Sequence, residues 1–231
     1  MPTDCIRYQN SGYFSSLIVD YLDQKSSLKS LYNRFPTIEN FEAQIIEKGT
    51  NYNHDNRKIV VAVLQKQYQN STISEATQNN ILALEQANTY TITTGHQLNL
   101  FSGPLYFLYK IISTINLASE LKAKYPNSNF VPIYWMATED HDFEEINYFN
   151  FKGKKFRWNK ESSGPVGRLS TEGLDAVFEV FTQELGSGSN AEKIKELFRK
   201  SYLGHSNLAE ATRFLANELF NEYGLVILDA D

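Results

Sequence analysis

Two segments of the sequence place polar side chains directly after short apolar runs, and both carry groups suited to acid–base or phosphate chemistry. The first segment, TTGHQLNLFSGPLYFLYK, spans residues 93–110, and its candidate binding residues are Thr94, Gly95, His96, Gln97, Asn99, Gly103 and Lys110. A glycine at a strand end lets backbone amides approach a ligand, and a helix amino terminus behind the loop favours an anion. The pattern suits a nucleotide, yet it has neither the GK[ST] of a P-loop nor the spaced glycines of a dinucleotide fingerprint. From position alone, loop glycines and an incidental histidine explain it equally well.

The second segment, WMATEDHDFEEIN, spans residues 135–147 and surrounds one imidazole with carboxylates. Its candidate residues are Glu139, Asp140, His141 and Asp142, with Glu144 and Glu145 just beyond. Carboxylates beside an imidazole raise its pKa, which gives an acid or base near neutral pH, and the same oxygens are able to hold a divalent cation. The alternative is a solvated first turn of a helix, since Asp and Glu favour that position.

The histidines do not indicate a metal site. The four of them, His54, His96, His141 and His205, show no HExxH or similar ligand spacing. His54 and His205 lie in polar stretches, which is typical of solvated surface histidines. The sequence therefore predicts no metal-binding residues, and it leaves open whether the chemistry needs a divalent cation.

The elements that position the two segments form a strand–helix–strand unit. Residues 89–93 (TYTIT) are rich in β-branched side chains and predict a strand that runs into Gly95. A helix is predicted from Ser102-Gly103-Pro104 to about residue 124, and apolar residues surround its first turns, which predicts burial on more than one side. Residues 130–136 (FVPIYWM) predict the next strand. A right-handed crossover makes the strands parallel, so both polar segments lie at the ligand-binding edge of an α/β sheet.

The rest of the chain divides into regions around that unit. Helical spacing over residues 14–88 predicts a helical amino-terminal region, in which Ser74 caps one helix. Alternating aromatic residues on both sides of Gly153 predict an inserted hairpin. The predicted hairpin strands are 148–151 and 155–158, and the predicted helices that follow are 171–184, 191–202 and 207–221. The predicted domains are 1–88 (helical), 89–145 (first βαβ unit), 146–205 (inserted hairpin and helices) and 206–231 (return helix and strand).

The carboxyl end, NEYGLVILDAD, is an apolar run followed by Asp229 and Asp231. A buried parallel strand delivers carboxylates to the ligand edge of a sheet in this way. A strand without a following helix leaves one side of a sheet poorly covered. We therefore expect an incomplete fold and a natural protein that continues.

Composition narrows the class of protein. The chain has 231 residues, 42% of them hydrophobic, and a net charge of −5, so it can bury a core but has no basic surface for nucleic acid. A single cysteine, Cys5, excludes an internal disulfide and a cysteine-rich zinc cluster, which fits a reducing compartment. The polar amino terminus and the lack of a run of about 18 apolar residues predict neither a signal peptide nor a membrane span. We expect a cytoplasmic protein with small-molecule partners.

At these segments the sequence resembles a known family, the bacillithiol biosynthesis cysteine-adding enzymes. The likeness lies in TTGHQLNLFSGPLYFLYK, VPIYWMATEDHDFEEIN and YGLVILDAD, in that order, with weaker likeness in NRKIVVAVLQKQY and GPVGRLS. It covers essentially the whole chain. Members of the family are much longer than this sequence, in agreement with the expected continuation.

The resemblance implies an α/β fold with a Rossmann-like parallel-sheet core similar to nucleotidylyltransferases, inserted segments, and a carboxyl-terminal coiled coil that makes the full-length protein a homodimer. It also implies a ligase that joins cysteine to glucosaminyl malate in the last step of bacillithiol synthesis, with ATP as co-substrate. Catalysis is then expected from His141, oriented by Asp140 and Asp142. The family commonly has glutamine at the position of His96, so we expect no obligatory catalytic role there.

Two other functions fit the same residues. A nucleotidylyltransferase acting on a small phosphorylated metabolite also uses glycine and histidine at strand ends. A non-catalytic metabolite-binding module is the third hypothesis. The products formed, or the absence of turnover, distinguish the three.

Overall fold

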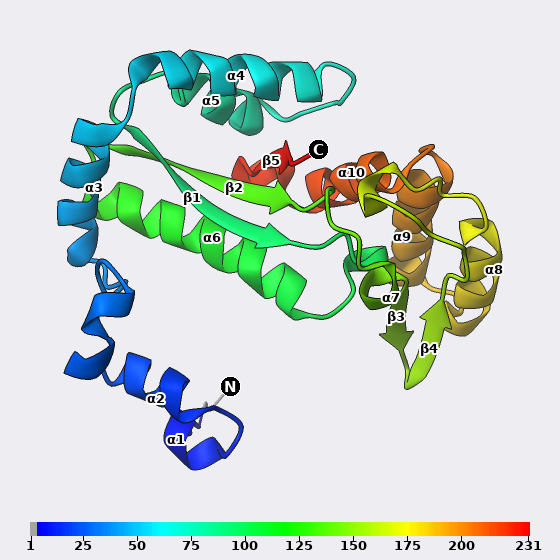
Figure 1. The fold of residues 1–231 in the computed structure, drawn as a ribbon. Helices are drawn as coiled ribbons and strands as arrows, with labels where there is room; N and C mark the ends of the chain where they lie inside the picture. Colours follow the sequence, from blue (N-terminus) through cyan, green and yellow to red (C-terminus); the bar gives the residue numbers. More distant parts are fainter. Residues whose placement is uncertain (1–3) are drawn as a thin grey trace. The chain divides into compact units, whose positions relative to one another are not determined.

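The computed structural model describes residues 4–231, which form two compact units, one ending at Asn51 and the other spanning Tyr52–Asp231 (Figure 1). The first unit is helical, and its elements are α1 (Tyr8–Ser11), α2 (Ser16–Leu22), the 3-10 turn η1 (Ser26–Leu31) and α3 (Asn40–Asn51). None of its described residues is buried. Its contacts include aromatic ones around Tyr21 and an ion pair of 2.6 Å between Arg34 and Glu47.

The second unit is built on a parallel sheet. Its strands are β1 (Thr89–His96), β2 (Asn129–Met136) and β5 (Val226–Asp229), in the order β1-β2-β5. The crossover between β1 and β2 is α6 (Tyr106–Lys124). The predicted βαβ unit is confirmed, because β1 and β2 pair in parallel from Thr89–Asn129 to His96–Met136. The final strand is confirmed as well, and it pairs in parallel with β2.

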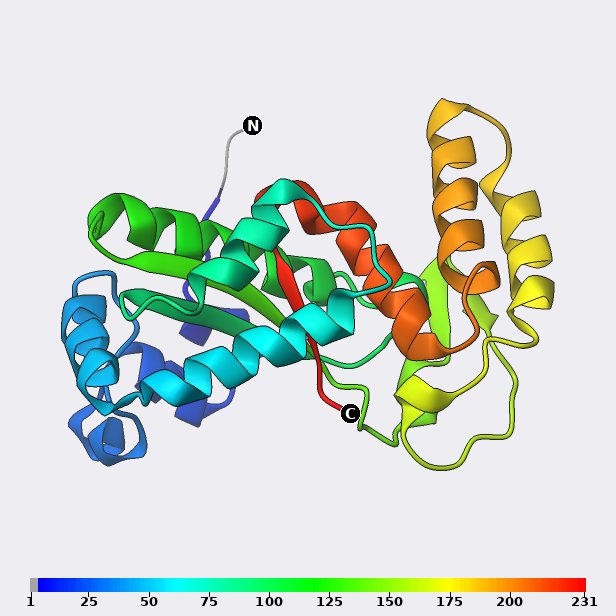
Figure 2. The ribbon, with the colours of Figure 1, turned by 90° about the horizontal axis from the view of Figure 1, so that it is seen from above.

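Helices cover both faces of the sheet. α6 packs on β1 and β2, while α4 (His54–Tyr68) and α5 (Glu75–Ala83) lie over the opposite face (Figures 1 and 2). Val61, Leu64 and Ile81 on these two helices are buried in the common core. The predicted cap is present, since Ser74 Oγ accepts a hydrogen bond of 3.1 Å from the Thr77 amide. The helical region predicted for 1–88 thus contributes to both units.

The segment between β2 and β5 forms a second cluster of elements. Its members are α7 (Phe143–Ile146), the hairpin β3 (Tyr148–Phe151) and β4 (Lys154–Arg157), η3 (Val166–Arg168), α8 (Leu174–Leu185), α9 (Ser189–Phe198), the π-helical turn η4 (Arg199–Leu203), α10 (Leu208–Phe220) and η5 (Asn221–Tyr223). The predicted hairpin is confirmed as an antiparallel pair. Packed rings hold the cluster together, since Phe181 contacts Phe149 and Phe156 at centroid distances of 5.0 and 5.6 Å. Phe181 also contacts Phe101, which lies between β1 and α6, at 5.5 Å.

The structure corrects the boundaries predicted around the first segment. β1 continues to His96, so Gly95 belongs to a strand and not to a loop. The turn η2 (Leu100–Ser102) comes next, and α6 begins only at Tyr106, so Gly103 and Pro104 precede the helix. Positive φ values at Phe101 and Ser102, 48° and 63°, form a tight turn that a helix cannot include.

The predicted burial of α6 on more than one side is wrong. Phe107 and Ile111 are buried against the sheet, but Tyr106, Tyr109 and Ile112 are 55%, 60% and 41% exposed. Apolar composition shows that a face favours burial, and it does not show whether a partner element covers that face. No helix among residues 4–231 is both long and apolar enough to cross a membrane.

Candidate functional site

The two polar segments meet through the side chain of Gln97. This residue follows β1 directly, and the acidic segment follows β2, so parallel pairing brings the two ends side by side. Gln97 Nε2 donates to Asp140 Oδ2 at 2.8 Å and to Glu145 Oε2 at 3.0 Å. One amide group therefore connects two carboxylates that lie 43 and 48 residues away in the sequence.

Asp140 is held in its ionised form. Its partial burial disfavours the charge, but hydrogen bonds from Gln97 and from the backbone N–H groups of His141 and Asp142 outweigh that effect and keep the pKa of Asp140 below its usual value. The His141 N–H donates to Asp140 Oδ1 at 2.7 Å. Each oxygen of this carboxylate thus has a donor, and the group is oriented as well as charged.

The other members of the acidic segment are exposed. The side chains of Glu139, His141 and Asp142 lie on the surface beside Asp140. Trp135 Nε1 approaches Glu139 Oε1 at 3.5 Å. His141 is therefore open to solvent and to a ligand, next to an oriented carboxylate.

The side chain of His96 is buried and lines one side of the site. It is 7% exposed, and its ring packs against Tyr106 and Phe107 at centroid distances of 5.0 and 5.3 Å. Burial lowers the pKa of His96, with a smaller contribution in the same direction from Lys110. Its Nδ1 lies 3.0 Å from the Gln97 carbonyl oxygen, which only accepts, so Nδ1 carries the proton. The buried Nε2 is then an acceptor, and it has no hydrogen-bond partner.

A small cavity of about 290 Å³ lies beside His96 and is lined also by Gly95 and Lys110. The Lys110 ammonium group donates to the Gly95 carbonyl oxygen across this cavity. The lysine is thus fixed over the end of β1 instead of extending freely into solvent. Its charge suits a phosphate or carboxylate at this position. Thr94, in contrast, is half-buried in β1 and does not line this cavity.

A larger cavity of about 800 Å³ is also lined by Gln97. Its lining includes Asn99, Gly103 and Glu145. Gly103 packs so closely on Asn99 that an added Cβ would lie 2.3 Å from Asn99 Cβ, and its φ is +48°. Glycine is therefore required at this position by contact as well as by conformation. Gln97 and Tyr106 both line the two cavities.

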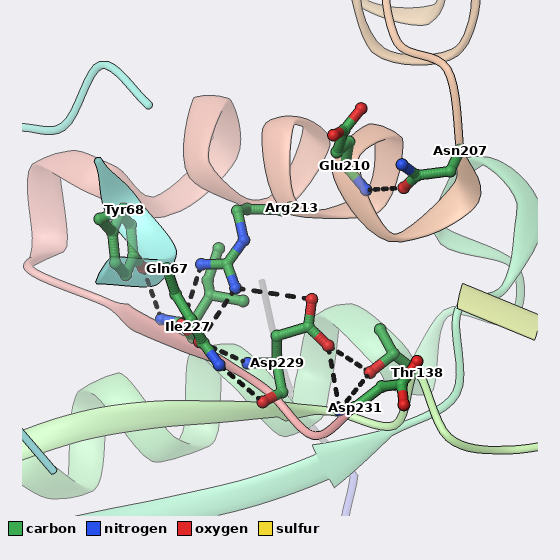
Figure 3. A network of polar contacts seen from close by, with 9 residues as sticks. All are labelled: Gln67, Tyr68, Thr138, Asn207, Glu210, Arg213, Ile227, Asp229 and Asp231. Carbon is green, nitrogen blue, oxygen red and sulfur yellow. Dashed lines mark hydrogen bonds and ion pairs between the residues drawn. The ribbon is translucent and has the colours of Figure 1, made fainter. Parts of the chain in front are cut away.

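The end of β5 is fixed by side chains from α4 and α10 (Figure 3). The side-chain amide of Gln67 donates to the Asp229 carbonyl oxygen at 2.9 Å and accepts from the Asp229 N–H at 3.0 Å. It thus pairs with the strand backbone as a neighbouring strand would. Tyr68 accepts from the Ile227 N–H at 2.7 Å, and Arg213 donates to the Ile227 carbonyl oxygen at 3.1 Å. These contacts satisfy the outer edge of β5 and hold the Asp229 carboxylate in place.

Thr138 links that strand end to the acidic segment, a role that the sequence did not reveal. Its hydroxyl donates to Asp229 and accepts from the Asp231 N–H at 3.0 Å (Figure 3). Its carbonyl oxygen accepts from the Gly167 N–H at 3.0 Å, and Arg168 pairs with Asp231 at 2.6 Å. Three segments therefore position the loop that carries Asp140. The only available signal was the weak likeness in GPVGRLS.

The predicted residues thus separate into distinct groups. Gln97 and Asp140 are in direct contact, and Asn99 and Gly103 pack together in the larger cavity. Glu145 was counted in the acidic segment without a binding role, although it lies at the centre of the contacts. Among residues 4–231, no group of three or more His, Cys, Asp or Glu side chains is placed to hold a metal ion.

Comparison with known proteins identifies the family. The model of the family described as "Bacillithiol biosynthesis BshC, N-terminal Rossmann-like domain" matches residues 1–231. Relatives from Flavobacterium johnsoniae and Flavobacterium psychrophilum are 71% and 70% identical over all of this chain and 44% of their own length. A relative from Bacillus cereus is 29% identical over 93% of the chain and 41% of its own length. All three carry the name "Putative cysteine ligase BshC". The chain spans less than half the length of these relatives. It matches the amino-terminal Rossmann-like domain of the bacillithiol biosynthesis BshC family, and it belongs to that family.

Proposed function

We propose that the full-length protein joins the carboxyl group of cysteine to the amine of glucosaminyl malate, the last step of bacillithiol synthesis, with ATP as co-substrate. The observation that carries the proposal is the contact of Gln97 with Asp140 and Glu145 at the ends of two neighbouring parallel strands. This edge is where open α/β sheets bind their ligands. The name of the relatives describes a cysteine ligase and the family description names bacillithiol biosynthesis, and together they support a cysteine-adding step in that synthesis.

The reaction requires activation of a carboxylate and deprotonation of an amine. ATP supplies the activation, as an acyl-adenylate with release of pyrophosphate or as an acyl-phosphate with release of ADP. The amine nitrogen then bonds to the acyl carbon, AMP or phosphate leaves, and the nitrogen gives up one proton. His141 is the group assigned to accept that proton, with the Asp140 and Asp142 carboxylates orienting its ring. Lys110 is assigned to the anionic end of a substrate in the smaller cavity.

The test uses the full-length protein, supplied with cysteine, ATP and glucosaminyl malate, and detects bacillithiol by mass spectrometry. The ratio of AMP to ADP formed identifies the activation chemistry. Replacement His141→Ala is expected to abolish ligation, while His54→Ala, a change at an exposed histidine of α4, retains it. Circular dichroism shows whether each variant is folded.

Each alternative gives a different result in this experiment. Pyrophosphate together with a nucleotide-linked product indicates a nucleotidylyltransferase. Thermal stabilisation by these ligands without turnover indicates a binding module. Wild-type turnover in the folded His141→Ala variant removes the assigned base and leaves Asp140 as the remaining candidate.

A further inference from the structure

The turn between β1 and α6 has a backbone conformation that most side chains avoid. Phe101 has a φ of 48° and a ψ of 55°, and Ser102 and Gly103 follow with φ values of 63° and 48°. Of these three residues only the last is a glycine. In the left-handed region Cβ lies too close to the following carbonyl oxygen, which destabilises an ordinary residue there. Two such residues in succession persist only where the surrounding structure holds them.

The side chain of Tyr202 contacts this turn at its backbone. Its hydroxyl accepts a hydrogen bond of 2.8 Å from the Phe101 N–H, which lies 101 positions away in the sequence. No backbone carbonyl group among residues 4–231 accepts that N–H. Tyr202 is 0% exposed and belongs to η4, and π-helical turns of this kind are frequent at functional sites. The hydroxyl therefore satisfies a donor that the turn itself leaves without a partner.

The ring of Phe101 is held by the same cluster of elements. It packs against the rings of Phe149 and Phe198 at centroid distances of 5.7 and 5.0 Å. These contacts fix the side chain, whereas the hydrogen bond to Tyr202 fixes the orientation of the peptide group between Leu100 and Phe101. The ring contacts alone do not require a left-handed backbone, so the hydrogen bond is the contact that selects it.

The conformation of the turn determines the lining of the larger cavity. Most of the residues that line this cavity belong to the segment 97–108, which contains the turn. Gly103 packs directly on Asn99, and Asn99 Nδ2 donates to the Glu145 carbonyl oxygen at 3.4 Å. A change from positive to negative φ at Phe101 or Ser102 would redirect the chain and separate Gly103 from Asn99. The contact between these two residues therefore depends on the turn.

We propose that Tyr202 is a positioning residue for the ligand site, because its buried hydroxyl holds the left-handed turn at Phe101 and Ser102, and the turn holds Asn99 and Gly103 in the lining of the larger cavity. The effect of this arrangement on ligation rests on the proposed function. The hold of Tyr202 on the turn does not, since it follows from the hydrogen bond and the backbone angles.

Replacement Tyr202→Phe in the full-length protein tests the role of the hydroxyl, because it removes that group and keeps the ring. Tyr68→Phe is the matched control, since it removes another buried hydroxyl, which accepts the Ile227 N–H of β5 at 2.7 Å. Both variants are expected to lower the Tm. Hydrogen exchange followed by mass spectrometry is expected to show amides 101–103 exchanging about 10-fold or more faster in Tyr202→Phe and at the wild-type rate in Tyr68→Phe.

Replacement Ser102→Gly separates the strain of the turn from simple packing, because glycine adopts positive φ freely. Added to Tyr202→Phe, it is expected to restore at least half of the lost exchange protection. In the ligation assay, Tyr202→Phe is expected to lower kcat/KM about 10-fold, and the double variant to recover at least about 3-fold of that loss. Ser102→Gly alone is expected to raise the Tm by about 1–4 °C, a measurement that does not require Tyr202→Phe to fold.

The outcomes separate this inference from the proposed function. Faster exchange at amides 101–103 in Tyr202→Phe, in a full-length protein without ligase activity, refutes the proposed function and keeps the hold of Tyr202 on the turn. Unchanged exchange in Tyr202→Phe, the same local change in Tyr68→Phe, no recovery on adding Ser102→Gly, or a lower Tm for Ser102→Gly alone overturns that hold. A wild-type kcat/KM in Tyr202→Phe overturns the positioning role.

Discussion

Replacement of Gly167 by alanine tests whether the loop that carries Asp140 is held by close backbone packing. A Cβ at this position would lie 2.6 Å from Thr138 Cβ, 2.9 Å from its Cγ2 and 3.0 Å from its carbonyl oxygen. Rotation of the Thr138 side chain does not relieve the contact, because Cβ and the carbonyl oxygen belong to the backbone frame. The two segments are also joined by hydrogen bonds, Gly167 N–H to Thr138 at 3.0 Å and Val166 N–H to Asp140 at 2.7 Å.

The cost follows from two contributions. Overpacking of a tight contact costs about 1–3 kcal/mol, and loss of one or both backbone hydrogen bonds costs about 0.5–1.5 kcal/mol each. We therefore expect Gly167→Ala to lower the free energy of unfolding by about 1.5–6 kcal/mol, and the Tm by roughly 3–24 °C for a unit of this size. Both tryptophans, Trp135 and Trp158, lie in the unit that spans Tyr52–Asp231, so tryptophan fluorescence during thermal unfolding reports on it.

Gly95→Ala is the matched control for stability. Its added Cβ would be 3.8 Å from the nearest atoms of Trp135, an ordinary contact, and its φ is not in the left-handed region. Alanine at such a position stabilises by about 0.4–1 kcal/mol, because the unfolded chain loses freedom. A Tm for Gly167→Ala equal to that of Gly95→Ala would refute the argument that close packing at Thr138 fixes the loop.

Three further changes probe the edge of the sheet, the buried histidine and the aromatic cluster. Gln67→Ala removes both hydrogen bonds to the end of β5 and is expected to cost about 1–3 kcal/mol in urea unfolding, while Gln65→Ala, at an exposed position of the same helix, costs less than about 0.5 kcal/mol. In the folded protein the pKa of His96 is below its ordinary value of 6.5, so the unfolded chain takes up a proton on this imidazole more readily than the folded chain does. The contribution of neutral His96 to the free energy of unfolding is therefore complete above pH 6.5 and decreases as the pH falls below 6.5. We expect His96→Gln to remove this contribution to the pH dependence of the Tm. Phe181→Ala, which empties a site that is 2% exposed, is expected to cost about 3–5 kcal/mol, against less than about 1 kcal/mol for Val180→Ala at 55% exposure. Equal losses for the two members of either pair, or an unchanged pH profile, would contradict the corresponding assignment.

The sequence was informative where local patterns decide the structure. Two strands could be predicted from the β-branched and apolar side chains of residues 89–93 and 130–136. Because a helix connects them, the right-handed crossover makes the two strands parallel. Polar residues directly after each strand then had to meet at one edge. For this reason Gln97 and Asp140 could be named together from the sequence, although their 2.8 Å contact joins residues 43 positions apart.

The sequence was uninformative where the outcome depends on a distant partner. Nothing in the local pattern around Thr138 shows that it contacts both Gly167 and the end of β5, because those segments approach it only after the whole unit has folded. The exposed face of α6 is a second case. Its apolar residues, among them Tyr109 at 60% exposure, have the composition of a buried surface, and composition alone cannot supply the element that covers it.

The length of β1 explains why His96 and Gln97 play different parts although they are adjacent. Because the strand continues to His96, residues 95 and 96 face opposite sides of the sheet, and a Cβ added at Gly95 would lie on the side away from the His96 ring. Gly95 lies beside Trp135, whereas His96 packs under Tyr106, and Gln97 is the first residue free to reach the next strand end. The buried position requires a neutral group with a donor for the Gln97 carbonyl oxygen, while the acceptor Nε2 has no partner there. A neutral histidine meets that requirement, and a glutamine carries the same pair of functions in its amide. Substitution His96→Gln should therefore preserve the Gln97 contacts and ligation while removing the proton-linked loss of stability, whereas His96→Leu, which lacks both groups, should lose the orientation of Gln97 and with it the contact to Asp140.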